Sequence, residues 1–250
     1  MLMLCVITGF SVNAQQPDFN FELYILAGQS NMAGRGTITD EYKNVGSEKL
    51  LMLNKDGKWV QAKHPLHFDK PTAAVGPGLA FGLEMSKANP NVKIGLIPTA
   101  VGGSPIESWL PGALDAATNT HPYDDAVERI KLAMKSGVIK GIIWHQGESN
   151  SNRPEQVKAY LEQLKELIGR FRKLAGNGNL PFVAGELGKY APFGNINEEI
   201  DKLPAAVPFT AVATTENLVH RGDNLHFDSS SADELGRRYA AKMLALQNKK

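Results

Sequence analysis

The chain of 250 residues has a single cysteine, Cys5, which excludes a disulfide framework and a thiolate metal site. It also lacks a charge excess, because 27 Lys and Arg against 26 Asp and Glu leave a formal net charge of +1. No block of like charges stands out, so a nucleic-acid partner is not expected. The G-x-G-x-x-G and G-x-x-x-x-G-K-S/T fingerprints of dinucleotide and phosphate sites are both missing.

Long hydrophobic runs are scarce as well. Only residues 1–10 are almost wholly apolar, and this stretch is too short to span a bilayer. Small residues then precede the polar Gln15, which is typical of the end of a secretory signal, although no Lys or Arg precedes the apolar stretch. We therefore predict a signal peptide over residues 1–14, a secreted or periplasmic protein, and one domain over residues 15–250. The alternative for the first segment is an ordinary β-strand.

What the chain does contain is an alternation of short apolar runs and amphipathic stretches, the pattern of an α/β fold with a parallel sheet. We expect five strands, at residues 21–27, 92–98, 138–145, 181–186 and 209–214. Helices are expected near residues 78–88 and 124–135, between a cap at Asn152 and Gly176, and over residues 231–246, where Ser231 and Glu234 have capping-box spacing. Residues 50–53 and 59–61 predict a hairpin at the rim of the sheet.

Polar, glycine-rich segments follow four of these strands, and ligands bind at that edge of a parallel sheet. Ser30 comes directly after the first strand and is bracketed by Gly28 and Gly34, a suitable place for a nucleophile. A phosphate-binding turn or a simple helix cap are the alternative interpretations of this serine.

A serine nucleophile needs a base, and the usual base is a histidine oriented by a carboxylate. Of the six histidines, His226 has an acid three residues before it, Asp223, in a loop past the last strand. The order Ser, Asp, His also occurs in α/β-hydrolases, but their nucleophile elbow requires glycine two residues after the serine, where this chain has Met32. The α/β-hydrolase fold is therefore disfavoured.

Four sequence blocks together resemble the SGNH or GDSL-like hydrolases, and within them the sialate O-acetylesterase and acetylxylan esterase branch, carbohydrate esterase family six. The blocks are Gly28-Gln29-Ser30-Asn31-Met32-Ala33-Gly34, Gly102-Gly103-Ser104-Pro105-Ile106-Glu107-Ser108-Trp109, Trp144-His145-Gln146-Gly147-Glu148-Ser149 and Asp223-Asn224-Leu225-His226. They occur in the order of that family and span nearly all of the chain after residue 14.

The resemblance implies a three-layer αβα sandwich around a central five-stranded parallel sheet, of flavodoxin-like type, and hydrolysis of O-acetyl groups on sugars. It implies Ser30 as nucleophile, His226 as general base and Asp223 as the residue that orients His226. Carried over in the same way, the oxyanion hole combines the backbone N–H of Ser30, that of Gly103 or else Gly102, and the side-chain amide of Gln146. Fixed donors of this kind contribute about 3 kcal/mol each.

Other roles remain open at this point. Glu148 is either an auxiliary or alternative partner of His226, or a loop acid bound to neighbouring backbone. The expected partner is an acetylated carbohydrate, acetylxylan or O-acetylated sialic acid, with no cofactor, metal, nucleic acid or membrane involved. A carbohydrate-binding module without catalysis, in which Trp109, Trp144 and Tyr190 stack on sugars, is one alternative, and a hydrolase of lipids or thioesters is another.

Overall fold

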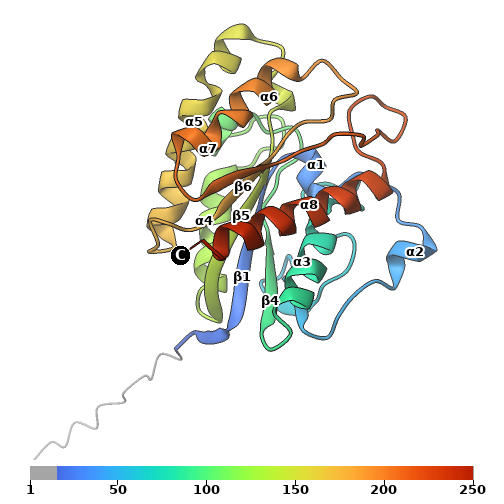
Figure 1. The fold of residues 1–250 in the computed structure, drawn as a ribbon, viewed down its shortest axis with the longest axis vertical. Coiled ribbons are helices and arrows are strands. Elements are labelled where there is room, and N and C mark those ends of the chain that lie inside the picture. The colour runs from blue at the N-terminus through green and yellow to red at the C-terminus, as the bar shows by residue number, and fades with distance from the viewer. Residues whose placement is uncertain (1–15, 250) are drawn as a thin grey trace, which may run out of the picture.

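The structure, a computed structural model, describes residues 16–249 and contains a seven-stranded sheet with helices on both faces (Figure 1). The strand order is β3-β2-β4-β1-β5-β6-β7, and every neighbouring pair is parallel except β2 and β3. The strands are β1 Asp18–Gly28, β2 Leu50–Leu53, β3 Trp59–Gln61, β4 Lys93–Pro98, β5 Gly137–His145, β6 Phe182–Gly185 and β7 Thr210–Ala213.

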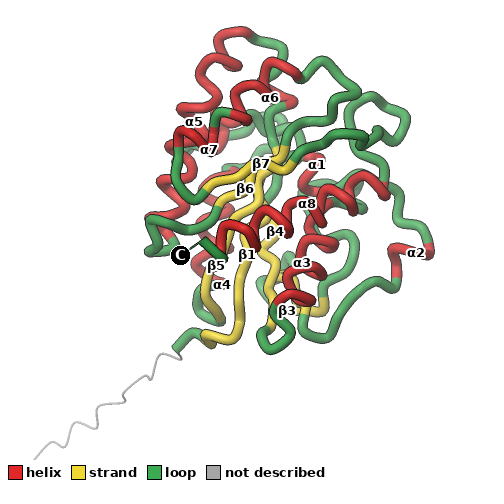
Figure 2. The backbone as a smooth tube through the Cα atoms, viewed as in Figure 1, coloured by secondary structure: helices red, strands yellow, loops and turns green. Residues whose placement is uncertain are grey.

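The helices form a layer on each side of the sheet, as Figure 2 shows by colour. They are α1 Ser30–Ala33, α2 Asp40–Lys43, α3 Pro77–Ala88, α4 Pro122–Ala133, α5 Pro154–Leu174, α6 Gly194–Asp201, α7 Leu203–Ala206 and α8 Ser229–Gln247, with 3₁₀ turns at Ile106–Trp109 and Glu148–Asn150. None of the helices described between residues 16 and 249 is both long and apolar enough to cross a bilayer.

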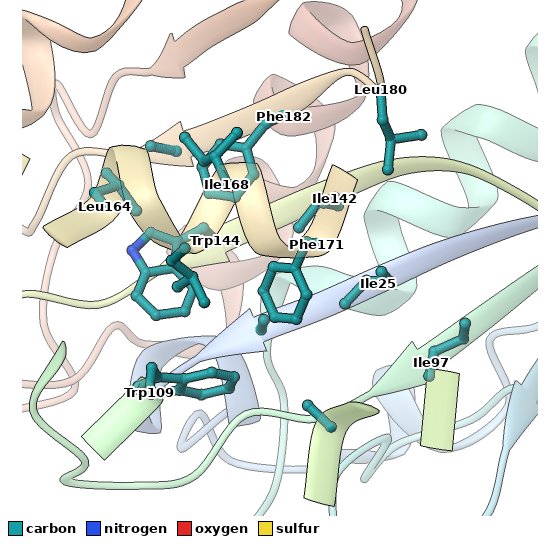
Figure 3. Close-up of a cluster of buried hydrophobic side chains, with 14 of the residues drawn as sticks. Ile25, Ile97, Trp109, Ile142, Trp144, Leu164, Ile168, Phe171, Leu180 and Phe182 are labelled. Carbon is teal, nitrogen blue, oxygen red and sulfur yellow. The ribbon is translucent and has the colours of Figure 1, made fainter. Parts of the chain in front are cut away.

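Each face of the sheet carries its own hydrophobic core, which is what a three-layer sandwich requires. One core lies beneath α4, α5, α6 and α7, and Figure 3 shows Trp109, Trp144 and Phe171 among its side chains. The other lies beneath α3 and α8 and includes Phe81 and Tyr239. The predicted αβα class is confirmed.

The sheet has more strands than the five that were predicted. All five expected strands are present, but the hairpin at residues 50–61 also belongs to the sheet, so the expected number of strands is wrong. Leu50 lies opposite Ile94 of β4 in parallel register, and Leu50, Met52 and Leu53 are buried. Burial of these side chains stabilises the hairpin as the continuation of the sheet rather than as a separate rim element.

The two helices for which the sequence predicts a capping residue, α5 and α8, have other residues at their N-caps. Pro154 occupies the first turn of α5, and Arg153 is the N-cap without a side-chain bond, so Asn152 does not cap it. Asp228 caps α8 by accepting from Ser231 N, and the Ser231 hydroxyl instead accepts from Val219 N. A helix accepts whichever side chain the preceding loop brings to its free N–H groups.

The carboxyl ends of β1 and β5 approach each other closely where the candidate residues follow. Gly28 has φ 130°, and a Cβ built on it would lie 2.1 Å from the backbone oxygen of His145. Glycine is therefore required at this position, both for its conformation and for the absence of a side chain. The loops after these strands consequently start from adjacent points.

Candidate active site

Ser30 lies where the sequence motif predicted it, at the turn from β1 into α1. Gln29 N donates to His145 O at 2.8 Å, and Gly34 N donates to Ser30 O at 2.8 Å, so the turn is fixed to β5 and closed on itself. Ser30 is 7% exposed and lines a cavity of about 530 Å³ at the carboxyl edge of the sheet. The strand therefore delivers a nearly buried hydroxyl to an open cavity.

The loop between β7 and α8 brings His226 and Asp223 to this hydroxyl. His226 Nε2 lies 3.0 Å from Ser30 Oγ, and His226 Nδ1 lies 2.8 Å from Asp223 Oδ2. One imidazole thus contacts the hydroxyl with one nitrogen and the carboxylate with the other, the geometry of a base with a fixed tautomer. The structure brings together three residues separated by almost 200 positions in the chain.

Asp223 is held in place by its own loop. Its Oδ1 accepts from Leu225 N at 3.0 Å and from His226 N at 2.8 Å. Partial burial by itself raises the pKa of the Asp223 carboxyl, but the hydrogen bonds from His226 and Leu225 outweigh it and lower that pKa to about 2. Asp223 is therefore an anion throughout the neutral range.

Glu148 also lines the cavity but forms neither a hydrogen bond nor an ion pair with His226. Its Oε1 accepts from Asn31 Nδ2 at 2.6 Å. The same Asn31 amide donates to Leu225 O at 3.1 Å, and its Oδ1 accepts from Phe227 N at 3.1 Å. Glu148 is therefore connected to His226 through Asn31, whose side chain binds the backbone of the residues before and after His226.

Burial gives Glu148 unusual acid–base behaviour. Desolvation raises the pKa of its carboxyl to about 7, against the lowering effect of the bond from Asn31. His145 Nε2 lies 3.7 Å away, too far for a hydrogen bond, and burial lowers the pKa of that imidazole to about 3. The neutral imidazole supplies no counter-charge, which leaves Glu148 readily protonated near neutrality.

The two backbone N–H groups that are alternatives for the oxyanion site, those of Gly102 and Gly103, differ in whether they already have an acceptor. Gly102 N donates to Asp69 Oδ2 at 2.9 Å, and Asp69 is in turn paired with Arg35 at 2.7 Å. For Gly103 N and Ser30 N, no acceptor is found among residues 16–249. The two sequence alternatives thus differ, since Gly103 N remains available and Gly102 N is occupied.

Gln146 is not brought to the cavity. It is 0% exposed, and its Nε2 donates to Asn150 Oδ1 at 2.7 Å, to Gln29 Oε1 at 3.2 Å and to Ser104 O at 3.3 Å. An amide already shared among three acceptors has no donor left for a substrate oxygen. This geometry disfavours the expected oxyanion role of Gln146.

The aromatic side chains proposed for sugar stacking are elsewhere. Trp109 and Trp144 are fully buried, with their ring centroids 5.1 Å apart at 81°, inside the core shown in Figure 3. Tyr190 donates its hydroxyl to Leu225 O at 3.2 Å. The binding-module interpretation therefore loses both of its tryptophans, which are core residues that fill space beneath the active-site loops.

Metal ligands are not assembled in the part of the chain that the structure describes. No group of three or more His, Cys, Asp or Glu side chains is placed to hold an ion there. His64 and His67 are buried, and desolvation lowers the pKa of each imidazole to about 4.

Sequence reasoning missed three residues that shape the site, namely Asn31, Arg35 and Asp69. Asn31 lies inside the first motif block, beside Ser30, and that position was the available signal. Arg35 and Asp69 come from separate segments and meet only in the fold, so no spacing pattern indicates them. Their contribution is to hold the loop that carries Gly103.

Comparison with known proteins identifies the family of the chain. The model of the family described as carbohydrate esterase, sialic acid-specific acetylesterase matches residues 20–245. The chain belongs to this family. It is therefore a carboxylic ester hydrolase of the carbohydrate acetylesterase type, and the predicted family is confirmed.

Individual relatives cover the chain to different extents. A probable carbohydrate esterase of Arabidopsis thaliana is 28% identical over 245 residues, 90% of each chain. The human sialate O-acetylesterase is 30% identical over 122 residues, which cover 43% of this chain and 22% of that protein.

Solved structures share the fold. An Arabidopsis thaliana protein matches with a TM-score of 0.79 and 26% identity, covering 90% of this chain and 98% of the other. NanS matches with a TM-score of 0.74 at 16% identity, over 94% of this chain and 99% of that one. At this identity, the likeness to NanS shows the fold alone.

Proposed function

We propose that this esterase removes O-acetyl groups from sugars through an acetyl-enzyme formed on Ser30. The observation that carries the proposal is the hydrogen-bonded series Ser30 Oγ, His226 and Asp223, with distances of 3.0 and 2.8 Å, at the edge of an open cavity. A nucleophile, a base within hydrogen-bond reach and a group that orients the base are the requirements for acyl transfer.

The first half of the reaction forms the acetyl-enzyme. Ser30 Oγ attacks the acetyl carbonyl carbon while its proton passes to His226 Nε2, and the carbonyl oxygen becomes an oxyanion. The backbone N–H groups of Ser30 and Gly103 stabilise this oxygen. The intermediate then collapses, the bond to the sugar oxygen breaks, and His226 returns the proton to that oxygen as the sugar leaves.

The second half releases acetate. A water molecule gives a proton to His226 Nε2 and attacks the acetyl carbon, and the breakdown of the second intermediate returns the proton to Ser30 Oγ. Asp223 remains ionised in both halves because its low pKa keeps it an anion beside the imidazolium. Its role is to stabilise that cation and to fix the tautomer of the neutral form.

The charges around the cavity favour a sugar that carries a carboxylate. Lys70 lines the cavity, and its Nζ lies 3.9 Å from where a Cβ on Gly103 would be. No acidic group lies within 4 Å of it among residues 16–249. An unpaired cation beside the reacting ester contributes most to the binding of an anionic substrate. O-acetylated sialic acid therefore fits better than neutral acetylxylan.

Two assays test the proposal. Wild type should release p-nitrophenol from p-nitrophenyl acetate, and Ser30→Ala should not. A binding module without catalysis would release none in either protein. Acetate release from O-acetylated sialic acid and from acetylated xylan is then compared in wild type and Lys70→Gln. Loss of the lysine should raise KM for the sialic acid by about tenfold, equivalent to about 1.4 kcal/mol, and raise KM for xylan less. An equal effect on both substrates would remove Lys70 as a carboxylate contact.

Export of the chain is proposed on the sequence alone. The expected signal peptide over residues 1–14 lies outside the described residues. N-terminal sequencing of protein secreted by the native cell would show a start near residue 15 if the segment is cleaved, and a start at residue 1 would exclude cleavage.

A further inference from the structure

The geometry points to His220 as a second histidine on which the site depends, a positioning residue that holds the turn around Asp223 only while its own ring is neutral. This inference rests on the proposed acyl transfer and adds a pH-dependent support to it. His220 lies in the loop between β7 and α8, six residues before His226, and is not among the residues that line the cavity with Ser30.

The loop that carries Asp223 is closed at its base and exposed at its tip. His220 pairs with Phe227 in an antiparallel bridge, and Arg221 N donates to His226 O at 2.9 Å. The tip, residues 222–225, is exposed throughout. Local hydrogen bonds rather than burial therefore hold the tip in its conformation.

The ring of His220 accepts two of these bonds. Its Nδ1 receives Gly222 N at 3.0 Å and Asn224 N at 3.1 Å, the residues immediately before and after Asp223. Neither N–H has another acceptor among residues 16–249. Both residues have positive φ, 110° and 56°, and the second value is uncommon for a residue with a side chain. One imidazole nitrogen thus fixes the turn on both sides of the carboxylate.

These bonds exist in only one protonation state of His220. Backbone N–H groups only donate, so Nδ1 must carry its lone pair, and the proton of the neutral ring must lie on Nε2. A second proton can go only to Nδ1, which then becomes a donor that faces two other donors. Protonation therefore breaks both bonds and releases the turn that carries Asp223.

The groups around His220 supply no opposing charge that would hold the ring protonated. On its own loop, Arg221 Nε lies 3.5 Å from Asp223 Oδ2, and Asp228 caps α8. From the segment between β6 and α6, the Tyr190 ring packs on His220 with centroids 5.1 Å apart, and burial raises the pKa of the Tyr190 hydroxyl, which keeps it neutral. No carboxylate oxygen lies within 4 Å of a ring nitrogen of His220 among residues 16–249.

The first test compares kcat/KM for p-nitrophenyl acetate in wild type and His220→Asn from pH 8 to pH 5. The Oδ1 of asparagine takes the place of Nδ1 and accepts bonds of the same kind, as in an Asx-turn, but it does not titrate. We expect the two proteins to agree within about twofold at pH 8. As pH falls, the ratio of variant to wild type should rise to about tenfold, because only wild type loses the two bonds in addition to the His226 base.

Two further variants distinguish this role from a merely structural one. His220→Leu has no acceptor and should lose about tenfold in kcat/KM at pH 8, with a pH profile parallel to that of His220→Asn. His121→Asn, the same change at the exposed N-cap of α4, is the matched control and should keep the wild-type profile. A ratio of His220→Asn to wild type that stays constant from pH 8 to pH 5 would overturn the inference, as would equal activities of His220→Asn and His220→Leu at pH 8.

A measurement without substrate separates this inference from the proposed function. Imidazole ¹⁵N NMR of the wild type at pH 8 should show His220 as the tautomer with its proton on Nε2. A proton on Nδ1 would overturn the role of His220 and leave the acetyl-enzyme mechanism in place. Full activity of Ser30→Ala would instead overturn the mechanism, whatever the tautomer of His220.

Discussion

A serine hydroxyl is a weak nucleophile until a base takes its proton, and in the proposed mechanism that base, His226, comes from one short loop. Asp223 binds both the ring and the backbone N–H of His226, so the acid that orients the imidazole also shapes the turn that carries it. Glu148, the other candidate acid, bonds to Asn31 and not to the imidazole. The two carboxylates therefore have separable roles.

Asp223→Asn should be the more damaging of two isosteric changes. It leaves His226 Nδ1 facing an amide that can hold the wrong tautomer, and turnover should fall about 10⁴-fold. Glu148→Gln keeps an acceptor for Asn31, and turnover should fall by no more than about one to two orders of magnitude. Steady-state kcat for both variants, with far-UV circular dichroism as a control for folding, decides the matter. A larger loss in Glu148→Gln would assign the principal role to Glu148.

Glu148 should also make stability depend on pH. In the folded chain its carboxyl titrates with a pKa of about 7 instead of the ordinary 4.5. The unfolded chain therefore releases this proton first as pH rises, and the free energy of unfolding falls between about pH 4.5 and 7, then levels off. The difference between the two pKa values corresponds to about 3 kcal/mol.

Urea unfolding of wild type and Glu148→Gln at pH 5, 6, 7 and 8 measures this contribution. The variant has no titrating group at position 148, so its stability relative to wild type should increase with pH by up to about 3 kcal/mol. Other ionisable groups cancel in the difference. A difference that stays constant from pH 5 to pH 8 would show that Glu148 is ionised throughout.

At the scale of elements, two segments must meet to form the site, namely α1 after β1 and the loop before α8. Asn31 on α1 holds Leu225 O and Phe227 N, so it fixes the loop on both sides of His226. Gly103 is positioned in a comparable way, because Asp69 binds the N–H of the preceding residue. Side chains that do not react themselves therefore set the distances between the reacting groups.

Asn31→Leu should lower both activity and stability. The substitution keeps the number and branching of the side-chain heavy atoms but removes the bonds to the loop and to Glu148, each worth about 1–3 kcal/mol when a buried partner is left unsatisfied. We expect kcat to fall about 10- to 100-fold and the free energy of unfolding to fall by about 2–4 kcal/mol. Asn20→Leu, at an exposed position of β1, is the control. Wild-type kcat in Asn31→Leu would show that the loop holds His226 unaided.

Elements whose burial leaves a local pattern could be predicted from the sequence. Periodicity located the five expected strands and the helices α3, α4, α5 and α8, because burial of one face leaves a local pattern. The pairing of β2 with β4 was not predicted, since it depends on a partner more than 40 residues away. The same holds for Gln146, whose amide is occupied by Gln29, Ser104 and Asn150 only once the chain is folded.

For the whole molecule, motif order predicted the architecture better than it predicted the cavity. Ser30, Asp223 and His226 meet as expected, because the carboxyl ends of parallel strands share one edge. The walls differ from expectation. Trp109, which would stack on sugars in the binding-module alternative, is buried in one core, Met32 is buried in the other, and Phe193 and Leu225 line the cavity.

This lining predicts which acyl groups the enzyme should accept. Apart from Phe193 and Leu225, the side chains around the cavity are polar or charged, among them Lys70, Arg35 and Glu148. Each added methylene would gain about 0.8 kcal/mol if it were buried against apolar surface, and only two of the lining side chains, Phe193 and Leu225, are apolar. We therefore expect kcat/KM to fall steadily from p-nitrophenyl acetate to the butyrate and the octanoate. The comparison is made below the critical micelle concentration of the octanoate, with Ser30→Ala as background. Faster hydrolysis of the octanoate than of the acetate would indicate an acyl-chain groove and replace the deacetylase assignment with a lipase-like one.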